Sequence, residues 1–347
     1  MFTKRSSLVL VSLLCIGLLA YFLAQQIHRY SATKAEWLLV RVVKPPFFVD
    51  YYAVDINTGK VIENIPPILT RQPQWSADEN WILFYSEGFE GFQEGLLQGF
   101  LYVKEEISLF NPSSGNEVSL LVEDGDYPQW SPDGKKIAYR VSNIDYSQLD
   151  YGEFEKLDRN TITSIYIMNV SCITQERSCQ LQPEFLVYGD DPSWSPDNQK
   201  VVYANNNAIY VVDLNDTGSP RQIMPERKSI SCLEPAWSNN GEQIIMRCND
   251  IRGFTIFDYE SGEKKILENP IYGGVRATWN STDERIVFEH FYLEKDREVP
   301  YSSLYIMDAD GSNISQLTNR KGEYINWFLW VPKSAEPLLK SCWLFCR

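Results

Sequence analysis

The amino-acid sequence predicts an all-β protein, a six-bladed β-propeller, with one N-terminal transmembrane helix in front of it. Three observations support this fold class: a tryptophan-containing segment that recurs six times, a blade-sized spacing between the copies, and short apolar runs separated by turn residues. At 347 residues, 44% of them hydrophobic, the chain is long enough to form one large domain of repeated units. Aromatic residues make up 14% of the chain, which favours many short strands.

The repeated segment combines a short strand, a turn and a second strand. Five clear copies contain Trp75, Trp130, Trp194, Trp237 and Trp279, and YINWFLW is a degenerate sixth copy aligned on Trp327. After Trp130, the turn Ser131-Pro132-Asp133-Gly134 follows, in which proline presets φ and glycine accepts a positive φ. A third apolar strand and a fourth segment come next, as in Leu304 to Met307 and Ser315 to Leu317. Each copy therefore predicts a four-stranded propeller blade.

The two ends of the repeat region complement each other. Residues 37 to 65 supply three strands without a first one, whereas Ile325 to Trp330 is a first strand with nothing after it. Pairing the two ends would hide sheet edges that otherwise stay open. We therefore expect the last strand to join the N-terminal strands in one blade and to close a ring over residues 37–332.

The repeat also carries a family resemblance. The pattern P-x-W-S-P-D-G, an apolar strand, then I-Y-x-M-D-x-D-G and the terminal Leu317-Thr318, resembles the TolB-like, WD-repeat-like propeller repeat. The resemblance covers about residues 37 to 332 and implies a six-bladed propeller. Only a short linker precedes the first strand, which leaves no room for the N-terminal α/β domain of TolB itself, so a role in an envelope complex is not carried over.

The N-terminus predicts a membrane anchor. Leu8 to Ala24 carries no charge and follows Lys4 and Arg5. Bulky Leu18 and Phe22 disfavour cleavage, so we expect an uncleaved helix, with a cleaved signal peptide as the alternative. The predicted plan is a cytoplasmic segment 1–6, a transmembrane signal anchor 7–24, a linker 25–36, the propeller 37–332 and a tail 333–347. The propeller is expected outside the cytoplasm, in the periplasm or at the cell surface.

Six cysteines lie outside the predicted helix, at Cys172, Cys179, Cys232, Cys248, Cys342 and Cys346. An even number favours disulfides in an oxidising compartment, and buried free thiols in a cytosolic protein are the alternative. If Asn239-Asn240-Gly241 is a hairpin tip, Cys232 and Cys248 face each other across two antiparallel strands. We predict this bond and a second between Cys172 and Cys179, which bracket a polar connection, and leave the pairing of Cys342 and Cys346 open.

Residues three and four positions before each tryptophan are expected around the central channel on one face of the propeller. They form an acidic arc with two arginines, and the candidate binding residues are Arg71, Asp126, Asp190, Asp191, Glu234 and Arg276. Long insertions at 87–100, 142–161 and 291–301 are expected on the same face. The arc suits a basic peptide or a hard cation such as calcium, and ordinary solvated turns are the alternative.

Composition narrows the function. With 46 acidic and 32 basic residues the chain carries a formal charge of -14, which opposes nucleic-acid binding. His28 and His290 are the only histidines, and the sequence has no G-x-S-x-G motif. It therefore lacks the residues expected for a histidine-based zinc site or a Ser-His-Asp triad. Asp308-Ala309-Asp310-Gly311 is interpreted as a strand turn and not as a calcium loop. We predict binding of a protein, peptide or envelope glycan without a cofactor; the alternative is a metal-dependent propeller hydrolase or lactonase that uses the carboxylates at the channel mouth.

Overall fold

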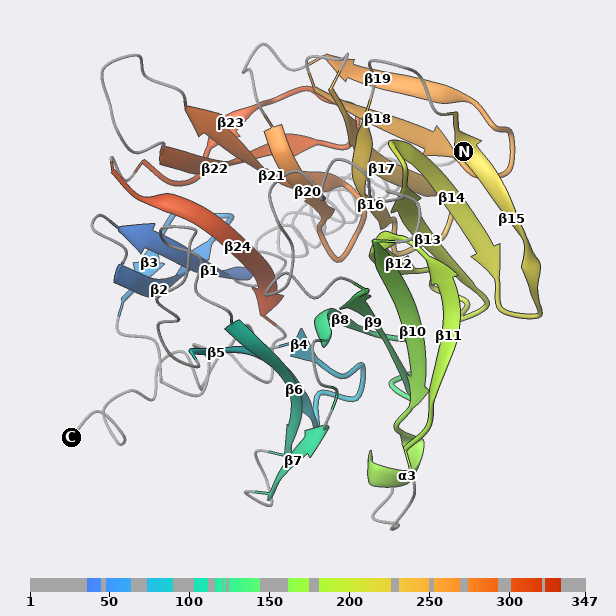
Figure 1. Cartoon of the computed structure of the whole chain (residues 1–347). Coiled ribbons are helices and arrows are strands. Elements are labelled where there is room, and N and C mark those ends of the chain that lie inside the picture. The colour runs from blue at the N-terminus through green and yellow to red at the C-terminus, as the bar shows by residue number, and fades with distance from the viewer. Residues whose placement is uncertain are drawn as a thin grey trace, which may run out of the picture.

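The structure is a computed structural model that describes residues 36–44, 48–63, 74–89, 103–111, 116–120, 122, 125–143, 162–174, 181–225, 231–249, 253–268, 274–292, 301–319 and 322–331. Six four-stranded antiparallel sheets surround a common centre, so the predicted six-bladed propeller is confirmed (Figure 1). The predicted anchor, linker and tail and most of the three long insertions lie outside the described residues. In the part of the chain that is described, no helix has the length and apolarity needed to cross a membrane.

Five blades are continuous in sequence, and one combines both ends of the propeller. Blade 1 contains β24 (Tyr324–Val331), β1 (Trp37–Lys44), β2 (Phe48–Asp55) and β3 (Val61–Ile62). Blade 2 contains β4 (Gln74–Trp75), β5 (Ile82–Phe89), β6 (Val103–Asn111) and β7 (Asn116–Leu120), and blade 3 contains β8 (Gly125–Trp130), β9 (Lys136–Ser142), β10 (Thr163–Asn169) and β11 (Pro183–Tyr188), with the short helix α3 (Ser171–Thr174) after β10. Blade 4 contains β12 (Asp190–Trp194), β13 (Lys200–Asn205), β14 (Ala208–Asp213) and β15 (Asp216–Met224). Blade 5 contains β16 (Cys232–Trp237), β17 (Gln243–Cys248), β18 (Gly253–Asp258) and β19 (Lys264–Glu268), and blade 6 contains β20 (Gly274–Trp279), β21 (Arg285–Tyr292), β22 (Tyr301–Asp308) and β23 (Ser315–Gln316).

The turn after each repeated tryptophan is held by its own side chains. In blade 3, the Ser131 hydroxyl donates to Asp133 at 2.7 Å and accepts the backbone N–H of Lys136 at 2.9 Å. Gly134 adopts a φ of 68°, which glycine tolerates without a Cβ clash. The same serine and aspartate contacts recur at Ser195 and Asp197 in blade 4. The S-P-D-G motif therefore closes the hairpin by local hydrogen bonds.

The hydrophobic core lies between neighbouring blades. Ile137 and Tyr139 of blade 3 pack against Leu83, Ile107 and Leu109 of blade 2, and all five side chains are buried. Because side chains alternate along a strand, the residues between them face the next blade, as Ala138 does. Full burial of one such aliphatic side chain stabilises the fold by roughly 1.5–3 kcal/mol. Trp130, Trp194 and Trp279 add a polar contact across the interface, since their indole N–H groups donate to the carbonyls of Gln74, Gln129 and Ala236 at 3.1, 3.2 and 3.3 Å.

The ring closes as predicted, because β24 pairs antiparallel with β1 and completes blade 1 (Figure 1). The alignment on Trp327 was wrong, however. In blades 3 to 6 the repeated tryptophan pairs with the first residue of the second strand that packs against the preceding blade, as Trp130 pairs with Ile137. In blade 1 that residue is Leu38, and it pairs with Trp330, whereas Trp327 pairs with Arg41. The segment Tyr-Ile-Asn-Trp resembles the start of the motif and ends at Trp327. Trp330, three residues later, is the tryptophan that packs against the preceding blade.

Two further predictions concern single connections. Cys232 and Cys248 lie opposite each other on β16 and β17 and form the predicted disulfide. Cys172 is also disulfide-bonded, while Cys179, Cys342 and Cys346 lie outside the described residues. The segment Asp308 to Gly311 is a turn, in which the Gly311 N–H donates to the Asp308 carbonyl at 2.8 Å, so its interpretation as a strand turn is confirmed.

Candidate binding site at the channel mouth

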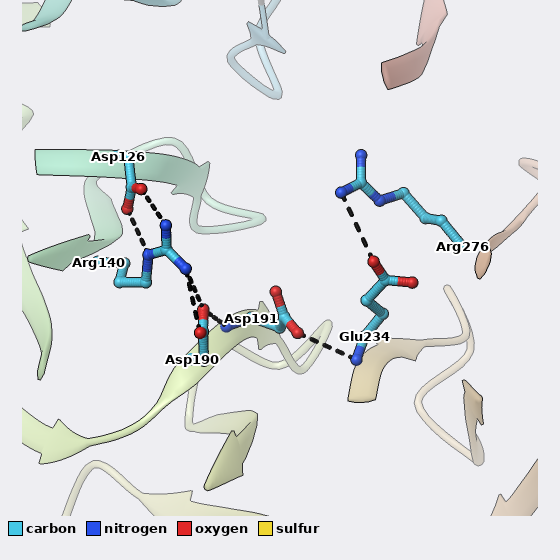
Figure 2. A network of polar contacts seen from close by, with 6 residues as sticks. All are labelled: Asp126, Arg140, Asp190, Asp191, Glu234 and Arg276. Atoms are coloured by element: carbon cyan, nitrogen blue, oxygen red, sulfur yellow. Dashed lines mark hydrogen bonds and ion pairs between the residues drawn. The ribbon is translucent and has the colours of Figure 1, made fainter. Parts of the chain in front are cut away.

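The propeller has two faces with different chemistry. We call the face with the turns after the repeated tryptophans the turn face, and the face where first strands begin and second strands end the mouth face. Five of the six predicted site residues are described and lie together on the mouth face, at Asp126, Asp190, Asp191, Glu234 and Arg276 (Figure 2). The sixth, Arg71, lies outside the described residues.

An unusual backbone conformation recurs at the start of three consecutive first strands. Tyr127, Asp191 and Glu234, each three residues before its tryptophan, have φ values of 47°, 51° and 52°. Such values are uncommon for residues other than glycine. The pairing with the second strand shifts at each of these places, which marks a β-bulge. Bulges re-aim side chains, so one local device directs these residues in blades 3, 4 and 5.

Arg140, on β9, joins blades 3 and 4. Its Nε donates to Asp126 Oδ1 at 2.6 Å, and its Nη2 also contacts Asp126. Its Nη1 donates to both carboxylate oxygens of Asp190, at 2.9 and 3.0 Å. The guanidinium carbon lies 4.4 Å from the ring centre of Tyr127. We call Asp126, Arg140 and Asp190 the Arg140 clamp, since one guanidinium holds two carboxylates from neighbouring blades (Figure 2).

A second group of charges lies between blades 4, 5 and 6. The backbone N–H of Glu234 donates to Asp191 Oδ2 at 3.1 Å, and Glu234 Oε1 lies 3.8 Å from Arg276 Nη2 (Figure 2). Arg247 and Glu289, near the ends of the second strands β17 and β21, interact electrostatically with Glu234. We call Asp191, Glu234, Arg247, Arg276 and Glu289 the inner charge cluster. It brings together three carboxylates and two guanidinium groups.

Burial dominates the electrostatics of this cluster. It raises the pKa of Glu234 to about 7, where repulsion from Asp191 adds to the effect and Arg276 opposes it. Burial likewise raises the pKa of Glu289 to about 7, against a hydrogen bond with Ser302 and the charge of Arg276. The pKa of Asp191 rises to about 6 through burial and the neighbouring Asp190. These three carboxyl groups therefore change protonation close to neutral pH.

Several polar atoms of the inner charge cluster are buried without a hydrogen bond. Among the described residues, Glu234 Oε2, Arg247 Nε and Glu289 Oε1 find no partner. Glu289 as a whole is only 5% exposed. A buried polar atom left unpaired costs roughly 1–3 kcal/mol, so native proteins keep few of them. The inner charge cluster therefore has buried polar atoms that lack hydrogen bonds, unlike the guanidinium of the Arg140 clamp.

Sequence reasoning missed the second-strand residues Arg140, Arg247 and Glu289. They stand ten residues after Trp130, Trp237 and Trp279, each inside an otherwise apolar strand. The sequence did contain a signal for them: the same position, ten residues after the tryptophan, is charged in three strands that are otherwise apolar. The predicted site used only positions before the tryptophans and therefore lacked these three residues.

His290 and the described carboxylates are the further candidates for catalytic or metal-binding groups. His290 is buried beside the rings of Tyr292 and Tyr305, with centroid distances of 4.3 and 5.7 Å, and burial lowers its pKa to about 4. Within the described residues, no group of three or more His, Cys, Asp or Glu side chains is arranged to hold a metal ion. The described carboxylates do not form such a site by themselves, and a calcium ion at the mouth stays a prediction.

Solved structures with similar folds define the class of propeller. TolB from Acinetobacter baumannii matches with a TM-score of 0.57 and 19% identity, over 86% of this chain and 67% of that chain. A putative TolB from Agrobacterium tumefaciens matches with a TM-score of 0.51 and 13% identity, over 86% of this chain and 99% of that one. An oligogalacturonate lyase in complex with manganese gives a TM-score of 0.51 at 12% identity, over 79% of this chain and 71% of that one.

The fold is therefore that of the TolB-like six-bladed propellers, as the repeat indicated. No protein-family model matches the sequence, and no curated protein sequence matches it. At identities below 20% the likeness concerns the fold alone, and function has to be argued from the site.

Proposed function

We propose that the protein is a binding module that engages a protein or peptide through the mouth face of its propeller. The observation that carries this proposal is the left-handed backbone at Tyr127, Asp191 and Glu234. Each such residue costs on the order of 1–3 kcal/mol, and strained residues persist mainly where their placement serves a site. Blades 3, 4 and 5 repeat this backbone conformation three residues before the tryptophan, and the side chains of these residues lie on the mouth face.

The chemistry of the mouth supports a basic partner. Carboxylates outnumber guanidinium groups in both the Arg140 clamp and the inner charge cluster, and the whole chain has a formal charge of -14. Tyr127, 41% exposed, adds an aromatic contact surface beside them. Aromatic residues ringed by polar groups are typical of protein interfaces, and complementary charge speeds association.

The proposal includes a position at a membrane, with the propeller on the extracytoplasmic side. The uncharged run Leu8 to Ala24 supports the anchor, and the Cys232–Cys248 disulfide supports an oxidising compartment. Membrane fractionation with protease added to intact cells tests this part. Full-length chain in the soluble fraction, or a propeller protected on the cytoplasmic side, would contradict it.

An enzyme is the second candidate, because an oligogalacturonate lyase has a similar propeller fold. A metal-dependent hydrolase or lactonase would need carboxylates that converge on one ion at the mouth. In the described residues, Arg140 instead stands between Asp126 and Asp190. Metal analysis of the purified full-length protein separates the two classes: one tightly held equivalent of metal supports the enzyme.

Photo-cross-linking from each face tests the binding proposal. A photoreactive amino acid replaces Tyr127 on the mouth face or Asp310 on the turn face of the full-length protein in its host membrane. We expect protein adducts from position 127 and few from position 310. The Asp191→Asn variant should reduce the adducts, because it removes a charge and keeps an oxygen for the N–H of Glu234. Asp190 is unsuitable, since Arg140 depends on it.

An exposed carboxylate on the turn face provides the matched control. Glu260 lies in the turn between β18 and β19, so Glu260→Gln changes the net charge equally and should leave the adducts unchanged. Adducts that form mainly from position 310, or that are unaffected by Asp191→Asn, would refute the mouth face as the binding site. Adducts that contain only glycan would refute the protein partner.

A further inference from the structure

The inner charge cluster contains more carboxylates than its arginines neutralise. Arg276 approaches Glu234 only to 3.8 Å, which is longer than a hydrogen bond. The guanidinium of Arg140 is already held by both Asp126 and Asp190. Within the inner charge cluster, the three carboxylates outnumber the guanidinium groups of Arg247 and Arg276 by one; both arginines interact with Glu234 and Glu289, and Arg276 also interacts with Asp191.

Two buried oxygens in this cluster are free to accept a hydrogen bond. Glu289 Oε1 and Glu234 Oε2 have no partner among the described residues, although Glu289 is only 5% exposed. They come from neighbouring blades, and both carboxylates interact with Arg276 and with each other. A buried carboxylate without a compensating donor is strongly unfavourable, and an added cation with several N–H groups would satisfy both oxygens.

We propose that the inner charge cluster is a subsite for one cationic side chain, an arginine guanidinium or a lysine ammonium, presented by a peptide on the mouth face. This inference rests on the proposed function and specifies the chemistry that the mouth recognises. The partner's cation lies between Glu234 and Glu289 and donates to the two open oxygens. Arg276 and Arg247 stay in place and set the orientation of the carboxylates.

An organic cation fits this cluster better than other ligands. An anion would be repelled by three carboxylates, and a bare metal ion needs oxygens that converge on one point, which the described side chains do not provide. Lysine offers three N–H donors and arginine five, which suits acceptors on two separate strands. Tyr324 interacts electrostatically with Glu289 and Glu234, so it belongs to the polar surroundings of the cluster.

Short peptides with a single charge test the subsite on the purified full-length protein. The probes are acetylated, amidated Gly-Arg-Gly and Gly-Lys-Gly, with Gly-citrulline-Gly as the neutral isostere of the arginine peptide. Binding is followed by ligand-observed NMR and calorimetry. We expect a Kd of about 1 mM or lower for the arginine or the lysine peptide, and at least about tenfold weaker binding of the citrulline peptide.

Three variants locate the binding. Glu234→Gln and Glu289→Gln should each raise the Kd of the charged peptides by about tenfold, because each removes one charged acceptor. Glu260→Gln, in an exposed turn on the opposite face, should leave binding unchanged. Circular dichroism and thermal melting confirm that each variant is folded, and the comparison of arginine with citrulline on the unmodified chain tests the proposal even if one variant does not fold.

The outcomes separate this inference from the proposed function. Equal binding of arginine, lysine and citrulline peptides, or unchanged binding in both glutamine variants, overturns the subsite. If position 127 still cross-links a protein in that case, the proposed function stands without the subsite. If the charged peptides are selected but position 127 cross-links no protein, the subsite stands and the proposed function is wrong.

Discussion

On the turn face, Asp78, Asp133 and Asp197 each accept a hydrogen bond from the serine two residues earlier, whereas on the mouth face Glu234 and Glu289 retain buried oxygens without a donor. The pKa values differ accordingly. Partial burial raises the pKa of the turn aspartates, but hydrogen bonds from serine and backbone outweigh it, so each pKa is lowered. On the mouth face burial wins, and the pKa of both glutamates rises to about 7.

This difference separates carboxylates that are satisfied within their own turn from carboxylates that the proposed ligand would satisfy. The carboxylates of Asp78, Asp133 and Asp197 are satisfied within four residues of sequence, so their hydrogen bonds do not depend on another blade. The mouth glutamates depend on groups from other blades, and some of their atoms are satisfied by none of the described ones. Hydrogen bonding is thus complete at the turn aspartates, whereas buried acceptors without a described partner remain on the mouth face.

Breaking the Arg140 clamp should have the largest effect on stability. Arg140→Met leaves Asp126 and Asp190 without their shared cation, and Asp126 is buried with 6% of its side chain exposed. We expect a loss on the order of 2 to 3 kcal/mol in the free energy of unfolding, measured by urea denaturation, because partial exposure of Asp190 reduces the full cost of a broken buried pair. Arg285→Met, at an exposed contact on the turn face, should cost about 0.5 kcal/mol or less. Equal losses in the two variants would show that the faces do not differ in this way.

The pH dependence of stability should differ in sign between the faces. The pKa of Glu289 is raised from 4.5 to about 7, so the folded state holds an extra proton in this range and stability falls as pH rises through it. Glu289→Gln removes that loss and should be more stable than the unmodified chain at pH 8, by on the order of 2 kcal/mol, with a smaller difference at pH 5. The charged groups that face Glu289 are Arg276, Arg247 and Glu234.

A turn aspartate provides the opposite case for the same measurement. The pKa of Asp133 is lowered, so its ionised form stabilises the fold above its ordinary pKa of 3.8, and that contribution is lost as the pH falls through the lowered value. Asp133→Asn should therefore be less stable than the unmodified chain at pH 8. Urea denaturation over about pH 2 to 8 decides the matter, because the contribution of Asp133 is lost only at the acidic end. If Glu289→Gln is destabilised at pH 8 as Asp133→Asn is, the contrast between the faces fails.

A smaller effect than those of Arg140→Met and Glu289→Gln is expected for a single turn serine. Ser131→Ala removes the hydrogen bond to Asp133 and the one from the backbone N–H of Lys136. We expect a loss of about 1 kcal/mol in the free energy of unfolding, because the exposed turn can rebond to water. Binding of the arginine peptide should be unchanged, as calorimetry would show. A change in peptide affinity would indicate that the turn face communicates with the mouth.

The sequence was sufficient for features that depend on local repetition. The turn motif, the blade length and the hairpin between Cys232 and Cys248 are each contained in short segments, and all are confirmed. It was insufficient where contacts between blades decide the outcome. Trp330 replaces Trp327 because of packing on blade 6, and Arg140 becomes a clamp only when Asp190 of the next blade is beside it. Offsets along one chain do not reveal which charges meet across a ring.

The pairing of β24 with β1 also sets an order of events during synthesis. Trp37 pairs with Val331, so the ribosome makes almost 300 residues between the two partners. At roughly 5–20 residues per second, β1 waits about 15 to 60 s for its neighbour. Throughout that interval blade 1 has an unpaired inner edge, which is the kind of surface that pairs with other chains. A chaperone or a translocation channel that shields residues 37–44 until Tyr324–Val331 emerges would therefore improve the yield of the closed ring.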